Sequence, residues 1–308
     1  MSPALGLIVA ILMQSSATGA PAPQAPADPT LASKIESLFH TITTTSDDSA
    51  DAAAKKEVSS IYASHGFPTV AEVGDEPSYE FIVLLNGNNI SSGERAKILP
   101  KIQAAAARGE IPADAAAFFA ARLRFEHIKE LAAAHPPSNP KLRDEIDRMY
   151  AEDQAVRQKE GFDAAKMQEI DRKNSPALEA ILEKFGVPTF STVGPEAAGE
   201  FVLMIQHQPA EFRARVLPQL KANVDKGEAD PDSFAKVYDR SQYDLGKPQL
   251  YGEQLVCNAG EKLHEAPIED PAHVNDRRAQ LGLIRAEIWT RLAAELMPQF
   301  CPPAAPQK

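Results

Sequence analysis

The sequence is short of cysteine and tryptophan, with two and one of them in 308 residues, and it has no run of 18 apolar residues. Two cysteines exclude a disulfide-dense small domain and a four-cysteine zinc site. Without a long apolar run, we expect no membrane span in the mature chain. Basic residues are also outnumbered, 32 against 43 acidic ones, which gives a net charge of −11. Because such a surface repels phosphate backbones, we expect no nucleic-acid partner.

Motifs for metal, nucleotide and nucleophile chemistry are missing as well. The sequence has no His-Glu-x-x-His, no phosphate-binding loop, no Gly-x-Gly-x-x-Gly and no Gly-x-Ser-x-Gly. His264 and His273 flank three acidic residues, but their spacing matches no known ligand set. We therefore predict no metal and no cofactor.

The two ends of the chain differ in composition from the rest. Leu5–Met13 is a short apolar run followed by small residues, which is typical of a signal-peptide core, although no basic residue precedes it. We predict a signal peptide over residues 1–20, a Pro/Ala linker over 21–30 and a disordered tail over 302–308. The mature protein is then exported, to the periplasm or the cell exterior. The alternative is a frayed apolar N-terminus of a cytosolic protein.

Export bears on the two cysteines, Cys257 and Cys301. In an oxidising compartment two lone cysteines of one domain can pair. We favour a disulfide slightly over two separate buried thiols, and closing this loop would stabilise the fold by roughly 4 kcal/mol.

Short motifs occur twice in the same order along the chain. His65–Thr69 (HGFPT) resembles Phe185–Thr189 (FGVPT), 120 positions later, and Leu99-Pro100 recurs as Leu217-Pro218, 118 positions later. Ordered matches that include glycine and proline predict two degenerate copies of one unit. We place the first copy at 31–135 and the second at 136–301.

The spacing of apolar residues in each copy is helical. Leu178, Ile181, Leu182 and Phe185 follow the i, i+3, i+4, i+7 pattern of one helix face. A glycine then a proline two positions later, as at Gly66 and Gly186, is typical of a helix end. No segment alternates like a strand over a useful length. We predict an all-α fold, with the second copy extended by an irregular polar loop and a C-terminal helix.

Polar residues differ between the copies. Gln206-His207 stands where the first copy has Asn86-Gly87, and Asp239 stands where it has Ala121. Residues present in both copies, such as Asp171 and its counterpart Asp51, are expected to be structural. The first copy is thus predicted to be a scaffold and the second to carry the site.

Asp153 lies on the apolar stripe of a predicted helix, and Arg157 follows one helical turn later. A buried carboxylate must be paired, so these two residues form either a structural ion pair or one wall of a polar pocket. If the repeat offset holds in this region, the first copy has Ser33 and Ser37 at these positions.

His207 is a candidate general base near a helix end, with Asp239 as the group that orients its ring if the fold joins them. The alternative is a histidine that only caps the helix. The segment 246–254 contains Gln249, Tyr251 and Gln254, whose amides and phenol suit recognition of a polar ligand. In the alternative interpretation these amides satisfy nearby backbone groups.

The second half of the sequence resembles the bacterial family known only as domain of unknown function 6624, over about residues 142–290. The residues that carry the resemblance are Asp153-Gln154, Arg157, Asp171, Asn174, Gly186, Pro188, Val193-Gly194, Gln206-His207, Asp239-Arg240, Gln249, Tyr251-Gly252, Gln254, Arg277-Arg278 and Gly282-Leu283. Glu253 departs from the pattern, since the family usually has a small hydroxyl residue there. The family has no assigned activity, so the resemblance implies which positions belong together and leaves the chemistry open.

Three functions compete on this evidence. In the first, an exported protein binds a small polar ligand, such as a cell-wall fragment, a sugar or a peptide, in one pocket of the second copy. Its residues would be Asp153, Gln154, Arg157, His207, Asp239, Arg240, Gln249, Tyr251 and Gln254. In the second, the same pocket is a cofactor-independent hydrolase or lyase, with His207 and Asp239 as the catalytic residues. In the third, the chain is a protein-interaction scaffold whose partner the sequence does not identify.

Overall fold

The computed structural model describes residues 25–87, 90–157, 163–258, 261–297 and 301. Within these residues the chain forms fourteen α-helices and one two-stranded hairpin, so the predicted all-α class is confirmed. None of the described helices is both long and apolar enough to cross a membrane. The predicted signal peptide and C-terminal tail lie outside the described residues. The predicted linker ends earlier than expected, because the first helix already begins at Pro29.

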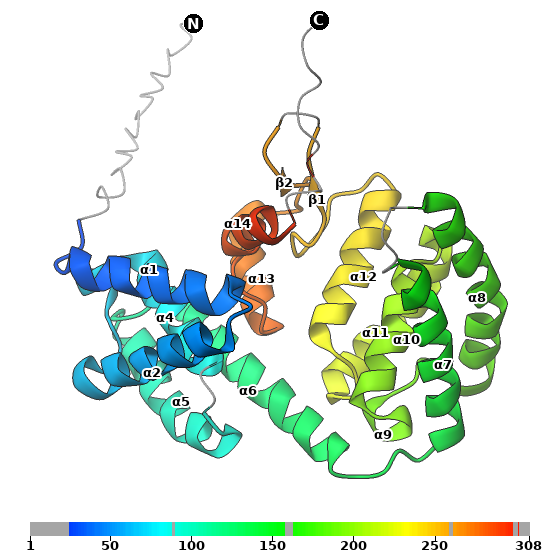
Figure 1. The fold of residues 1–308 in the computed structure, drawn as a ribbon, viewed down its shortest axis with the longest axis horizontal. Helices are drawn as coiled ribbons and strands as arrows, with labels where there is room; N and C mark the ends of the chain where they lie inside the picture. The colour runs from blue at the N-terminus through cyan, green and yellow to red at the C-terminus, as the bar shows by residue number, and fades with distance from the viewer. Residues whose placement is uncertain (1–24, 88–89, 158–162, 259–260, 298–300, 302–308) are drawn as a thin grey trace, which may run out of the picture.

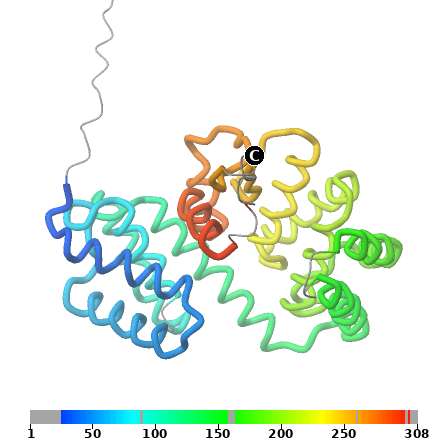
Figure 2. Tube along the Cα trace, turned by 45° about the horizontal axis from the view of Figure 1, so that its top comes forward, coloured from blue at the N-terminus to red at the C-terminus, as the bar shows by residue number. Residues whose placement is uncertain are grey.

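The helices form two groups that lie side by side (Figures 1 and 2). The first group comprises α1 (Pro29–Thr44), α2 (Asp48–His65), α3 (Val70–Val73), α4 (Asp75–Gly87), α5 (Ser92–Ala107) and α6 (Ala113–Ala133). The second comprises α7 (Pro140–Arg157), α8 (Ala164–Phe185), α9 (Phe190–Val193), α10 (Pro195–Gln206), α11 (Ala210–Lys226) and α12 (Pro231–Asp244). The long helix α6 leads from one group to the other (Figure 1).

The C-terminal segment returns to the first group. It contains β1 (Leu255–Val256) and β2 (His264–Glu265), which pair antiparallel, then a short 3₁₀ turn (Pro271–His273), α13 (Val274–Gln280) and α14 (Ala286–Leu296). Ala279, Ile288 and Leu292 are buried in the apolar core of the first group. The predicted second unit, 136–301, therefore has its last two helices packed on the first unit, because their apolar side chains complete that core.

Each group has a one-turn helix in third place, α3 or α9, followed by a longer one after a single glycine. α3 and α9 begin at Val70 and Phe190, 120 positions apart. Gly66 and Gly186 end α2 and α8 with φ of 76° and 72°, as their position before a proline predicts. Both glycines adopt a backbone conformation that other residues rarely take.

The register of α1 against α7 differs from the expected one. Asp28 donates its backbone N–H to the carbonyl of Glu72, and Asn139 donates to Thr192 in the same way. These bonds align Asp28 with Asn139, an offset of 111 and not 120 positions. The counterpart of Asp153 is consequently the apolar Ile42, and Ser33 is not its equivalent. The offset changes here because α7, its connection to α8 and α8 itself are all longer than the corresponding stretches α1, the α1–α2 connection and α2.

The two cysteines lie together. The Sγ atoms of Cys257 and Cys301 are 2.21 Å apart, with their Cα atoms at 5.7 Å, so the predicted pairing is confirmed at bonding distance. This bond connects the segment after β1 with the chain beyond α14.

Candidate functional site

A cavity of about 650 Å³ opens between the second-group helices. Its wall comes from the end of α7, one face of α8, the turn between α10 and α11, and the last turn of α12. The lining side chains are almost all polar: Arg157, Gln168, Asp171, Arg172, Ser175, Gln206, His207, Gln208, Pro209, Arg213, Arg240 and Asp244. Such a wall suits a polar ligand better than an apolar one.

One side of the cavity is built on a buried carboxylate. Asp153, on α7, is 1% exposed and accepts two bonds of 2.9 Å from Arg157, one turn further along the helix. Gln154 also donates to Asp153, at 3.0 Å. Arg157 reaches across to Asp171 on α8 with the same guanidinium. The predicted pair Asp153–Arg157 is therefore present, and it joins two helices at the wall of the cavity.

His207 faces this pair from the C-terminal end of α10. Its Nδ1 lies 3.8 Å from Oδ2 of Asp153, which is too long for a hydrogen bond. The same atom is buried and has no hydrogen-bond partner among the described residues. Burial, together with the positive charge of Arg157, lowers the pKa of His207 to about 4, although Asp153 acts in the opposite direction. The ring is thus neutral at pH 7, with Nδ1 shielded beside Asp153 and another part of the ring in the cavity wall.

Arg213 fixes the turn that carries His207. Its buried guanidinium donates to the carbonyl oxygens of Gln206 and Gln208 and to the carboxylate of Asp244. Arg240 binds the same carboxylate at 3.3 Å and remains half exposed at the mouth of the cavity. One aspartate therefore serves two guanidiniums, and the excess positive charge lies on the side where Arg240 is accessible.

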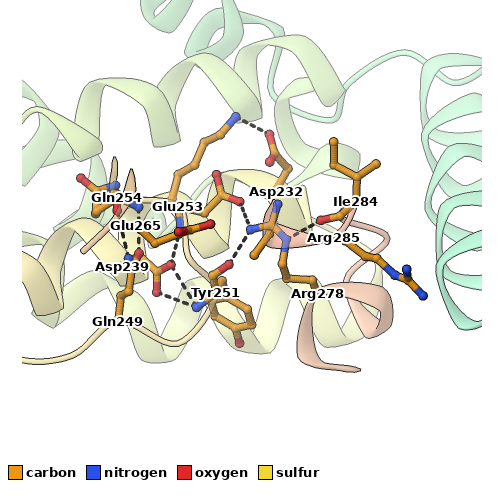
Figure 3. A network of polar contacts seen from close by, with 12 residues as sticks. Asp232, Asp239, Gln249, Tyr251, Glu253, Gln254, Glu265, Arg278, Ile284 and Arg285 are labelled. Atoms are coloured by element: carbon orange, nitrogen blue, oxygen red, sulfur yellow. Dashed lines mark hydrogen bonds and ion pairs between the residues drawn. The ribbon is translucent and has the colours of Figure 1, made fainter. Parts of the chain in front are cut away.

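Asp239 does not take part in this cavity. It is fully buried on α12, and its carboxylate accepts the backbone N–H groups of Leu250, Tyr251 and Glu253 at 2.8–3.2 Å (Figure 3). Together these three N–H groups engage both oxygens. Asp239 therefore does not orient the His207 ring, as the sequence had suggested, because its carboxylate is hydrogen-bonded to the polar loop. The carboxylate that faces His207 is Asp153.

The amide of Gln249 in the polar loop also points inward. Gln249 is 1% exposed; its Nε2 donates to the carbonyls of Gln254 and Ala266, and its Oε1 accepts the N–H of Gln254. Tyr251 is buried against the rings of Phe234 and Tyr238. Gln249 and Tyr251 therefore hold the loop on α12 and the hairpin (Figure 3), and for Gln249 this is what the alternative interpretation of the segment expected. Gln254 takes part through its backbone N–H and carbonyl, and none of the three residues lines the cavity.

The cavity also contains residues that the sequence comparison passed over, such as Asp171, Arg172 and Asp244. Asp171 was expected to be structural because Asp51 matches it. In the structure Asp51 pairs with Lys55 on its own helix, whereas Asp171 bonds Arg157 on another. The signal for Asp171 was its place in the family pattern beside Asp153 and Arg157.

Asp153, Asp171 and His207 could in principle hold a metal, since one ligand atom of each lies within 4.8 Å of the others. The guanidinium of Arg157, however, already bonds both aspartates and supplies the positive charge between them. A metal ion would have to displace it, so the donor set fits a cation poorly. The absence of a metal stays a prediction.

The polar residues of the cavity and the loop all fall within one matched region. The family model described as a family of unknown function, DUF6624, matches residues 140–297. The chain belongs to the DUF6624 family. The match begins at the first residue of α7 and ends just after α14, so the DUF6624 region contains the cavity, the loop and the two helices that return to the first group. Comparison with curated proteins and with solved structures found no match.

Glu253, which departs from the usual DUF6624 pattern, has a defined partner in this chain. Its side chain is 3% exposed and bonds the equally buried Arg278 of α13 at 2.8 Å (Figure 3). Burial raises the pKa of Glu253, and Arg278 partly opposes this shift. The substitution thus ties the loop to α13.

Proposed function

We propose that the protein is an exported binding protein whose second-group cavity holds a small polar ligand with an anionic group. The observation that carries this proposal is the convergence of Arg157, Arg172, Arg213 and Arg240 with a neutral His207 on one cavity of about 650 Å³. Among the described residues, the carboxylates that form ion pairs with these four guanidiniums are Asp153, Asp171 and Asp244. In a chain with a net charge of −11, a locally positive cavity favours an anion.

The ligand would bond to groups that the fold leaves free. Arg157 and Arg213 are committed to buried partners, whereas Arg240 is 49% exposed. A carboxylate or phosphate would bind Arg240, and a hydroxyl or amide group of the same ligand would bond the His207 ring where it lines the cavity. A sugar acid or a short peptide combines these groups.

We also propose that the two helix groups are copies of one unit, the first kept as scaffold. Arg95 and Arg122 share Glu126 in the first group as Arg213 and Arg240 share Asp244 in the second. The copies differ at the α7 side of the cavity. Asp153, which bonds Arg157, stands there where the first copy has the apolar Ile42. This supports a site gained or kept by one copy only.

A thermal-shift and calorimetric comparison tests the proposed function. N-acetylmuramic acid is a sugar with a carboxylate, N-acetylglucosamine is its uncharged counterpart, and D-alanyl-D-alanine supplies a peptide carboxylate. We expect one of the two carboxylates to bind, N-acetylglucosamine to bind at least about tenfold more weakly, and Arg240→Gln to abolish that difference. Failure of both carboxylates, or binding that Arg240→Gln leaves unchanged, would contradict the proposed ligand class.

Catalysis by the same cavity is the second candidate. The free Nδ1 of His207 favours it, since a neutral imidazole can take a proton from water or a substrate hydroxyl in a hydrolase or lyase step. A pKa of about 4 makes this base weak at pH 7, which favours binding. An anionic ligand would raise the pKa and strengthen the base, so turnover of the bound compound should be assayed beside binding.

An interaction scaffold has less support. Large exposed apolar side chains among the described residues are Leu131, Phe185, Tyr243, Leu245 and Leu296, and they are scattered. Only Leu131 belongs to the predicted first unit, where a scaffold should present a patch. Export, in turn, is supported by the cysteine pair, which an oxidising compartment would preserve.

A further inference from the structure

A second cavity, of about 400 Å³, lies between the two helix groups. Its walls come from the end of α4, from α6, from the start of α12, and from the α13–α14 turn. Val83, Phe118, Leu283 and Ile284 give it an apolar side, and the rest of the lining includes five charged residues and Trp289. It shares no lining residue with the His207 cavity.

Trp289 of α14 is in this wall, and its indole N–H lacks an acceptor. Nε1 is buried and has no hydrogen-bond partner among the described residues. A buried donor without a partner is unfavourable, since it has lost its bond to water and gained nothing in return. An acceptor that entered the cavity would satisfy it.

Two ion pairs in the wall are balanced in charge. Arg278 bonds Glu253 and two backbone carbonyls (Figure 3), and Lys236 bonds Asp232 one helical turn away at 2.6 Å. Each pair has one charge of each sign. They leave the wall neutral and contribute no free charge to a ligand.

Arg122 is different, because it shares its carboxylate. Glu126 bonds both Arg122 and the buried Arg95, so one negative charge serves two guanidiniums. Arg122 is 41% exposed, and its aliphatic stem packs against Gly282 so closely that a Cβ there would come within 2.8 Å of Cδ. This contact holds the guanidinium across the gap between α6 and the α13–α14 turn.

We propose that this second cavity binds a small carboxylate with an apolar body, held by Arg122 and the indole N–H of Trp289. The carboxylate offsets the uncompensated charge of Arg122 and accepts from Nε1, while the apolar body packs on Val83 and Phe118. A phosphate or a sugar would place polar groups against those two apolar side chains. The ligand class proposed here therefore differs from the one proposed for the His207 cavity.

The chain offers a direct reporter, because Trp289 is its single tryptophan. The test titrates the full mature protein with 4-methylpentanoate and with 4-methylpentanamide, its uncharged counterpart, by tryptophan fluorescence and calorimetry. We expect saturable binding of the carboxylate and at least about tenfold weaker binding of the amide. Arg122→Met should weaken the carboxylate to the level of the amide, while Arg240→Gln, in the other cavity, should leave its affinity unchanged.

Trp289→Phe, followed by calorimetry, separates a loss of the donor from a loss of folding. It keeps an aromatic ring at this position but lacks the indole N–H, and weaker binding by this folded variant supports the proposal. No saturable heat or fluorescence change with the carboxylate overturns it. Equal binding of carboxylate and amide, or binding that Arg122→Met does not weaken, overturns it as well. None of these results bears on the His207 cavity, which Arg240→Gln tests separately.

Discussion

At the scale of single residues, the chemistry of the second group depends on an unusual histidine. His207 is mostly buried, and its Nδ1 has no partner among the described residues. The positive charge of Arg157 lowers its pKa more than the negative charge of Asp153 raises it. These conditions disfavour the imidazolium, and they make the ring sensitive to any anion that enters the cavity.

The lowered pKa of His207 predicts a pH dependence of stability. The unfolded chain binds a proton at this residue below about pH 6.5, whereas the folded chain does so only below about pH 4, so the native state loses stability as the pH falls through that window. In His207→Gln this loss should shrink by about 2–3 kcal/mol. Urea unfolding of the wild type and of His207→Gln at pH 7 and pH 4.5 measures this loss. If the free energy of unfolding falls equally in the two proteins, the lowered pKa of His207 is contradicted.

Removal of Arg157 should expose the cost of the buried Asp153. In Arg157→Met the carboxylate keeps only Gln154 and the distant His207, so we expect a loss of about 3 kcal/mol at pH 8. The loss should be smaller at pH 5, because His207 can then become protonated and pair with Asp153. Arg172→Met, in the exposed wall of the same cavity, is the control and should change stability by less than about 0.5 kcal/mol. Equal losses in the two variants would show that Asp153 is not dependent on Arg157.

At the scale of elements, α12 and the polar loop act as one piece through Asp239. Asn at this position has one acceptor oxygen, and its amide hydrogens would oppose the loop N–H groups. We expect Asp239→Asn to lower the free energy of unfolding by about 2–4 kcal/mol while the pKa of His207 stays unchanged. Asp225→Asn, on an exposed site of α11, is the matched control. A shifted His207 pKa in Asp239→Asn would restore the orienting role that the sequence suggested.

The sequence predicted the elements better than the partners of their polar residues. Helix ends at Gly66 and Gly186 follow from local backbone rules, and the pair Asp153–Arg157 follows from its spacing on one helix face. The partner of Asp239 could not be predicted in this way. It accepts backbone N–H groups 11 to 14 positions later in the chain, and such bonds depend on the path of the loop, which no side-chain pattern encodes.

At the scale of the whole molecule, the C-terminal helices pack against the N-terminal group of helices. α13 and α14 return to the first group, where Arg285 bonds Asp114 and Asp75, and the cysteine pair fastens the end of this segment to the hairpin. The packing of α14 on the first group could not be predicted from the spacing of its apolar residues. That spacing shows that Ile288 and Leu292 face a core, but not which of the two cores it is.

Loss of the cysteine pair should therefore lower the stability of the whole fold. Cys301→Ser should lower the free energy of unfolding by roughly 4 kcal/mol under oxidising conditions, and reductant should lower the wild type to the same level. Guanidinium unfolding with and without reductant measures both. If reductant does not affect the wild type, the two cysteines do not form a stabilising bond.

The most direct measurement of the central claim is an NMR titration of the His207 ring in the free protein and in the presence of N-acetylmuramic acid or D-alanyl-D-alanine, whichever binds. The account predicts a pKa near 4 in the free protein and a rise when the carboxylate is bound, because the ligand adds a negative charge beside Arg240. A free pKa near 6.5, or a bound carboxylate that leaves the His207 titration unmoved, would contradict it.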